Sequence, residues 1–207
     1  MKNMAIETLE GQGHTVVLSD LYGQGFNPVA QKWDFVTTSG GHFNYMLEQK
    51  HASNLGMAFS PDITAEIQKL QQCDLVMFAA PLWWNGVPAI LKGWFDRVLA
   101  MGVAWNSGKF YENGLMRGKQ AMLALAIGHP VEYYQSVGLH KTDTRQLLQP
   151  INHGILAFCG FNVHEPFLAL NVLGADEPTR DNALKELQFR LEHFVDSPNW
   201  YERFVSN

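Results

Sequence analysis

The chain has 207 residues, 46% of them hydrophobic and 12% aromatic, which suffices for one domain with a sizeable core and excludes a disordered tail or a mini-protein. Its 15 basic and 20 acidic residues give a net charge of −5, and this sparse supply of Lys and Arg argues against a nucleic-acid-binding groove. Charged residues make up only 17% of the chain, which suggests that a partner subunit or an aromatic ligand covers part of an apolar surface.

The cysteines and the apolar runs indicate where such a protein works. Cys73 and Cys159 each lie in an apolar run, where Cys usually serves as a small buried hydrophobe, so a reducing compartment is expected. The first residues carry acidic side chains and no apolar signal segment. The longest apolar run, residues 75–84, has about half the roughly 20 residues that a membrane helix needs. We expect a soluble, cytoplasmic protein with no membrane span.

Strands and helices are expected to alternate along the chain. Short β-branched or continuously apolar runs predict strands at residues 14–19, 73–80, 120–127 and 161–170. Helical spacing and capping residues predict helices over residues 1–12 and 143–158, and from residues 60, 88 and 178 onward. The last of these is expected to bury Leu184, Leu187, Leu191 and Phe194. No repeat or linker divides the chain, so residues 1–207 are predicted to form a single domain.

This alternation favours an α/β fold with an open, doubly wound parallel sheet between two layers of helices, a three-layer α/β/α arrangement. Ligands of such folds bind beyond the carboxyl ends of the strands. The chain has no GxGxxG, no GxxxxGK[ST] and no GxSxG motif. His140, His153 and His164 are too far apart in sequence for a local metal motif, so no metal site is expected.

Two segments leave the ends of predicted buried strands and carry the candidate chemistry. The first is PLWWNGVP, residues 81–88, which runs directly into a helix. Its backbone N–H groups and its adjacent Trp83 and Trp84 would suit a flat heteroaromatic group. The alternative is that the two Trp rings only seal the sheet against the next helix.

The second segment is IGHP, residues 127–130, followed by Tyr134 and His140. A Tyr hydroxyl and a His imidazole in one loop can converge and donate hydrogen bonds to charge that develops on a ligand. The alternative is that both are ordinary surface or capping residues.

The stretch PLWWNGVPAILKGWFDR, residues 81–97, closely resembles a segment of the NAD(P)H:quinone oxidoreductase family, the DT-diaphorase-like flavoproteins with a flavodoxin-like fold. Residues 19–22 (SDLY), 26–28 (FNP), 60–63 (SPDI) and 154–161 (GILAFCGF) also resemble that family, and the resemblance covers roughly residues 5–195. It implies a flavin-binding domain with FAD, or alternatively FMN. It also implies ping-pong hydride transfer from NAD(P)H to a quinone, nitro or azo compound, in a pocket at a homodimer interface.

Carried over by position, the resemblance assigns roles to individual residues. Tyr134 and His140 match the catalytic Tyr and His, which stabilise negative charge on the reduced flavin. The flavin would be held by Pro81, Leu82, Trp83, Trp84, Asn85 and Gly86, by Ile127, Gly128 and His129 on its other side, and by Arg180 near the adenine. The substrate pocket of the partner subunit would be covered by Trp105, Ser107 and Phe158.

The chain departs from the family pattern at three places. His129 stands where the family usually has a second Gly, and Ser107 replaces a Tyr. The chain also begins in the helix that follows the family's first strand and phosphate-binding loop, so we expect this N-terminal strand to be missing. In the strand order 2-1-3-4-5 that strand lies inside the sheet.

The sequence therefore predicts a flavin-dependent quinone reductase. Two alternatives stay open: an ancillary regulatory flavoprotein of a potassium-efflux system, and a non-catalytic truncated relative that binds no flavin. The choice between NADH and NADPH also stays open, because no Arg for a 2′-phosphate is identifiable.

Overall fold

A computed structural model of the chain describes residues 1–194. A parallel sheet lies at its centre, and the expected continuous apolar runs form its two long strands. These are β1 (Leu75–Pro81) and β2 (Gln120–Ala126), paired along their whole length. The other edge of β2 pairs with β3 (Asn162–Val163) and then with β4 (Phe167–Ala169), both parallel. Since β2 is central, its residues 121–125 are fully buried.

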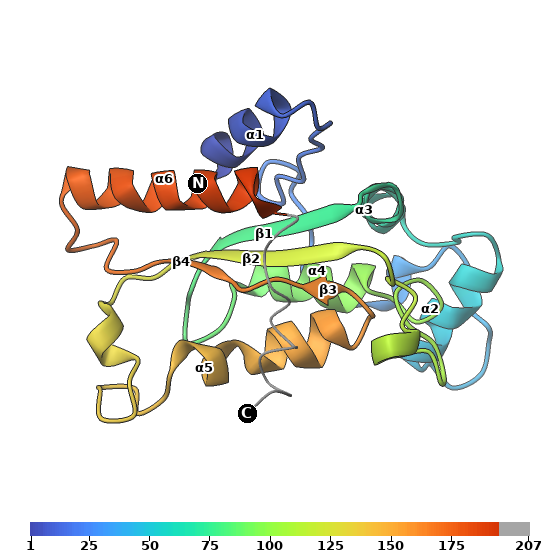
Figure 1. The fold of residues 1–207 in the computed structure, drawn as a ribbon. Helices are drawn as coiled ribbons and strands as arrows, with labels where there is room; N and C mark the ends of the chain where they lie inside the picture. The colour runs from blue at the N-terminus through green and yellow to red at the C-terminus, as the bar shows by residue number, and fades with distance from the viewer. Residues whose placement is uncertain (195–207) are drawn as a thin grey trace.

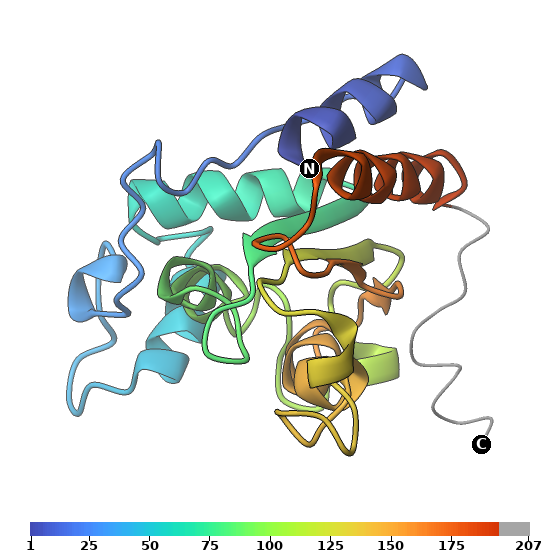
Figure 2. The same cartoon turned by 90° about the vertical axis from the view of Figure 1, so that its left-hand side faces the viewer.

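Helices cover both faces of this sheet, as Figure 1 shows. On one face α6 (Glu177–Glu192) packs against α1 (Lys2–Gly11) and over β4. On the other face lie α4 (Ala89–Val98) and α5 (Thr144–Ile151), while α3 (Pro61–Gln72) packs beside α4. Helix α2 (Tyr45–Asn54) follows the long segment after α1 (Figure 2). The predicted three-layer α/β/α class is confirmed.

Local sequence explains why the helices bury the faces they do. Ser60 and Pro61 begin α3, and its Ile63, Ile67 and Leu70 are buried on one stripe. Asp176 caps α6 by accepting a hydrogen bond from the Thr179 backbone N–H. Of the residues expected to be buried on this last helix, Leu187 and Leu191 are, whereas Leu184 and Phe194 are half-buried.

The expected strand over residues 14–19 is wrong. The segment is extended but bonded to no strand among residues 1–194, and Val17 and Leu18 are exposed. A β-branched run becomes a strand only where a neighbouring edge accepts its backbone hydrogen bonds. Within the described chain β1 pairs with β2 alone.

Two other predicted elements are interrupted. The strand expected over residues 161–170 is split, because β2 advances three residues from Ala121 to Ala124 while its partner advances four from Val163 to Phe167. The extra residue is a β-bulge, next to a proline that has no N–H to donate. The helix expected over residues 143–158 changes from α5 to a π-helix, Asn152–Ala157, just after Pro150 removes a helical hydrogen bond.

Candidate functional site

Three loops meet at the carboxyl edge of the sheet. The first loop (residues 82–88) follows β1, the second loop (residues 127–143) follows β2, and the third loop (residues 170–176) follows β4. The Leu82 N–H donates to the Ala126 carbonyl at 2.9 Å, and the Ile127 N–H donates to the Ala169 carbonyl at 2.8 Å. The third loop is also bonded to the second, since the Asn171 N–H donates to the His129 carbonyl at 2.9 Å. The sheet therefore brings together the two segments singled out in the sequence.

The first loop contains a tight turn that displays its tryptophans. Trp83 and Gly86 exchange two backbone hydrogen bonds of 2.9 Å, and the residues between them, Trp84 and Asn85, have φ angles of 51° and 58°. Two positive φ angles at the centre of a two-residue hairpin define a type I′ turn. Such a backbone is uncommon for a Trp, and strained positions of this kind cluster at functional sites. Trp83 is 54% exposed and Trp84 is fully exposed, so these rings do not seal the sheet in this structure.

The second loop gathers imidazole and phenol rings. His129 and His140 stack with ring centroids 5.5 Å apart, and His129 Nδ1 lies 3.2 Å from His140 Nε2. The Tyr134 ring stacks on the His140 imidazole, with ring centroids 4.7 Å apart. The loop folds tightly at Gly138, which lies against the backbone carbonyl of Glu132. A Cβ at position 138 would lie only 2.3 Å from that carbonyl oxygen, so a larger residue would not fit. The convergence proposed from the sequence for Tyr134 and His140 is thus present as a direct ring contact.

Tyr134 is the buried member of this group, only 6% exposed and part of the main hydrophobic core. Burial raises the pKa of its phenol above the usual value of 10.0. The hydroxyl therefore keeps its proton through neutral and mildly alkaline pH, as a hydrogen-bond donor must.

The residues assigned to the substrate pocket lie elsewhere in this chain. Trp105 donates from Nε1 to the Leu99 carbonyl at 3.1 Å, and its ring lies 5.6 Å from that of Phe158. Ser107 is exposed. Phe158 follows the far end of the helical run 144–157, whereas His140 precedes its start. A run of this length spans about 20 Å, so one chain does not bring Phe158 and the Trp105 ring beside it to its own His140.

Arg180 lies apart from both groups. It is exposed in the first turn of α6, directly after the third loop. It is therefore on the same carboxyl side of the sheet as the first two loops.

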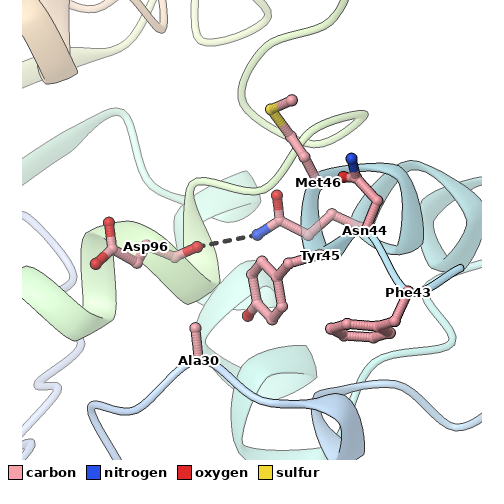
Figure 3. A pocket seen from close by; sticks show the side chains of 7 residues that line it. Ala30, Phe43, Asn44, Tyr45, Met46 and Asp96 are labelled. Carbon is pink, nitrogen blue, oxygen red and sulfur yellow. Dashed lines mark hydrogen bonds between the residues drawn. The ribbon is translucent and has the colours of Figure 1, made fainter.

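A groove lies beside Trp105 and Phe158. One cavity of about 610 Å³ is lined by Ala30, Phe43, Asn44, Tyr45, Met46, Gln49 and Asp96 (Figure 3). A second, of about 340 Å³, shares Met46, Gln49 and Asp96 with the first and continues to Trp105 and Phe158. The Gln49 side-chain amide donates to the Asp96 carbonyl at 2.9 Å, which ties α2 to α4 beneath the groove.

A buried ionic centre lies under the same region and was not predicted from the sequence. Arg97, 2% exposed, bonds both carboxylate oxygens of the fully buried Asp34, at 2.9 and 3.1 Å, and one oxygen of Asp62 at 2.8 Å. The Tyr45 hydroxyl also donates to Asp34, at 2.6 Å, and burial together with that carboxylate raises the pKa of Tyr45. Asp34 lies 63 residues from Arg97, and no local pattern signals so distant a pair.

Comparisons with known proteins agree with this architecture. The family profile described as "Flavodoxin-like fold" matches residues 1–191. The human ribosyldihydronicotinamide dehydrogenase [quinone] is 40% identical over 194 residues, which cover 93% of this chain and 83% of that protein. The rat NAD(P)H dehydrogenase [quinone] 1 is 41% identical over 194 residues, 93% of this chain and 70% of that protein. The chain belongs to the flavodoxin-like quinone oxidoreductase family.

A solved member of this family has nearly the same fold. A candidate quinone reductase from Klebsiella pneumoniae superposes with a TM-score of 0.90 at 34% identity, over 96% of this chain and 79% of that one. Within residues 1–194, no helix is long and apolar enough to cross a membrane. No group of three His, Cys, Asp or Glu side chains is placed to hold a metal ion in the same part of the chain. Both Cys73 and Cys159 are free thiols.

Proposed function

We propose that this chain is a flavin-dependent NAD(P)H:quinone oxidoreductase that works as a cytoplasmic homodimer. Its relatives at about 40% identity are named quinone dehydrogenases. The observation that supports the proposal is that exposed Trp83 and Trp84 and the stacked Tyr134–His140 pair belong to loops that follow the adjacent strands β1 and β2, at the edge of the sheet where this class of fold binds ligands. A bound flavin supplies the hydride carrier, which accepts a hydride from NAD(P)H and passes it to the quinone.

The residues present fit a flavin. Exposed indole rings are unusual on a protein surface and offer flat faces for a heteroaromatic ring system. Pro81 at the end of β1 and Leu82, Asn85 and Gly86 of the first loop would hold its ring and ribityl chain, together with Ile127, Gly128 and His129 of the second loop. The space at Gly86 is open, since a Cβ there would meet only the Trp83 carbonyl, at 3.8 Å.

Tyr134 and His140 act as hydrogen-bond donors in this proposal. The hydroxyl of Tyr134 holds its proton because burial raises its pKa. The imidazole of His140 stacks on that ring, with the two centroids 4.7 Å apart. Donors fixed in this way stabilise negative charge without reorganising when it develops.

A second copy of the chain would complete the substrate pocket. Phe158 follows the far end of a helical run about 20 Å long that begins after His140, and Trp105 packs against Phe158. They can cover a pocket only if they come from a partner. The groove beside them exposes aromatic and apolar side chains such as Phe43 and Met46, which a second copy would cover.

FAD is the flavin that we favour, because the resemblance places Arg180 on the adenine side, and Arg180 is exposed next to the third loop. FMN is the alternative. The names of the relatives favour an enzyme over an ancillary subunit of a potassium-efflux system.

A visible spectrum tests the proposal directly. The purified chain is mixed with excess FAD or FMN, freed of unbound flavin by gel filtration, and then assayed with NADH, NADPH and menadione. We expect one flavin per chain, reductase activity and the sedimentation of a dimer. A colourless protein would overturn the flavin proposal and support the non-catalytic alternative, whereas a coloured monomer would overturn only the shared pocket.

A further inference from the structure

His129 and His140, to which the proposed function gives separate roles, contact each other as an imidazole pair in the second loop. His129 Nδ1 and His140 Nε2 lie 3.2 Å apart with their rings inclined by 26°, which is hydrogen-bond distance between two ring nitrogens. His129 stands at the position where the family usually has Gly, so this contact is a property of this chain.

The backbone fixes both members of the pair. The His129 carbonyl accepts from Asn171 N–H of the third loop at 2.9 Å, and the His129 ring lies 5.0 Å from the ring of Tyr133. The backbone N–H of His140 donates to the Tyr133 carbonyl at 3.0 Å, and the Tyr134 ring stacks on the His140 ring at 4.7 Å. These contacts within the second loop and with the third loop hold the two nitrogens close to each other.

A hydrogen bond between two imidazoles requires one N–H and one lone pair. A reactive His is usually oriented by a carboxylate or a backbone carbonyl on its second ring nitrogen, and that bond sets its tautomer. Within residues 1–194 no carboxylate or carbonyl oxygen bonds the His140 ring. Instead, the Nδ1 of His129 lies at hydrogen-bond distance from its Nε2.

We propose that His129 is a positioning residue, which holds Nε2 of His140 and thereby leaves Nδ1 of His140 as the nitrogen that can donate to a ligand. The proposal rests on the proposed function, since it assigns a partner to the donor His140. In this arrangement His129 Nδ1 donates to His140 Nε2, and the proton of His140 stays on Nδ1.

Ring-nitrogen NMR of the flavin-free protein tests the proposal without any turnover. In ¹⁵N-labelled protein, the chemical shifts of the two ring nitrogens report which one carries the proton. We expect His140 in the wild type to be in the Nδ1–H form, and His129→Ala to convert it to a mixture of both tautomers. His129→Asn keeps an amide near the position of Nδ1 and should restore the wild-type pattern. His14→Ala removes another exposed imidazole and should change nothing at His140.

Kinetics of the flavin-loaded protein give the second measurement. We expect His129→Ala to lower kcat about tenfold, with partial rescue in His129→Asn, and to change the KM for menadione by less than about twofold. The His140→Ala variant separates the two proposals. If the wild type binds flavin but His140→Ala turns over normally, the donor role in the proposed function fails.

If instead His140→Ala is impaired while His129→Ala keeps the wild-type tautomer and turnover, only the positioning proposal is overturned. A gain in turnover in His129→Ala would also overturn it, because the ring would then obstruct the site rather than orient His140. If the wild type binds no flavin, the tautomer spectra alone still decide the inference.

Discussion

Two clusters of polar rings and charges in this molecule are built in opposite ways. Around Arg97 each charge is matched: Arg97 and Asp34 are buried and Asp62 is half-buried, and Asp34, Asp62, Tyr45 and the Asn27 carbonyl all lie within 3.1 Å of a partner atom. In the second loop, His129 is exposed and its ring bonds one nitrogen of His140. The hydrogen bonds of the first cluster stabilise the fold, whereas in the proposed function the hydroxyl and ring N–H groups of the second loop donate to a ligand.

This difference predicts which substitutions damage stability and which damage chemistry. A buried charge whose partner is removed keeps its full desolvation cost. Removing one charge of the Arg97 centre should therefore lower the free energy of unfolding strongly. In the second loop His129 is exposed and His140 half-buried, and Tyr134→Phe keeps the buried ring, so the loss of one polar group there should cost the fold little. Substitutions in the two clusters should therefore have separable effects.

The largest effect is expected for Arg97→Met. This change leaves Asp34 buried without its bidentate partner and should lower the free energy of unfolding by about 3–5 kcal/mol, measured by urea denaturation. Lys92→Met on the same helix is the matched control, because its ion pair with Asp96 is exposed and should be worth less than about 1 kcal/mol. Equal decreases in the free energy of unfolding in the two variants would mean that the buried ion pairs of Arg97 stabilise the fold no more than an exposed one does.

The next effect concerns turnover rather than folding. Tyr134→Phe keeps the stacked ring and removes only the hydroxyl, and His140→Ala removes the imidazole. Each should lower kcat about tenfold to a hundredfold, as expected for one lost donor, while the urea midpoint moves little. Steady-state assays with menadione, run beside the denaturation curves, measure both. Unchanged turnover in both variants would remove these residues from the mechanism.

The sequence was informative where a pattern is local or continuous. The apolar runs that became β1 and β2 were predicted to within two residues, and the spacing of Ile63, Ile67 and Leu70 predicted the buried face of α3. It failed where the outcome depends on a distant neighbour. The run at residues 14–19 has strand composition but no edge beside it among residues 1–194, and a bulge divides the last strand.

The candidate site shows the same limit. The two loops could be predicted because each follows a buried parallel strand, and such strands end at one edge. The turn geometry could not be, since the Asn–Gly pair at residues 85–86 would ordinarily occupy the centre of a type I′ turn, yet the structure centres the turn one residue earlier, on Trp84 and Asn85. The contact between His129 and His140 spans an irregular loop of eleven residues, for which no periodicity exists.

A smaller effect is expected from acid. Burial alone would raise the pKa of Glu66, but hydrogen bonds from Lys69, Trp94 and Ser19 outweigh it and hold the pKa below the usual 4.5. A carboxylate with a lowered native pKa stabilises the fold fully above its unfolded pKa and loses that contribution as the pH falls through the native one. Unfolding curves at pH 7 and below 4.5 should therefore differ less in Glu66→Gln than in the wild type. An identical pH dependence in both proteins would mean that Glu66 does not drive the acid loss.

The smallest effect tests the cost of displaying an aromatic ring in the first loop. Trp84 has a φ of 51°, which costs a bulky residue about 1 kcal/mol more than it costs Asn. Trp84→Asn should therefore raise the free energy of unfolding by about 1 kcal/mol, and it should also weaken flavin binding about fivefold through the loss of one stacking face. Trp33→Asn removes a Trp that is 74% exposed in the loop before α2, so it should leave flavin affinity unchanged. If Trp84→Asn were more stable yet bound flavin as tightly as the wild type, the strained backbone at Trp84 would not contribute to flavin binding. Opposite changes in stability and affinity would show that this loop, unlike the Arg97 centre, gives up stability for function.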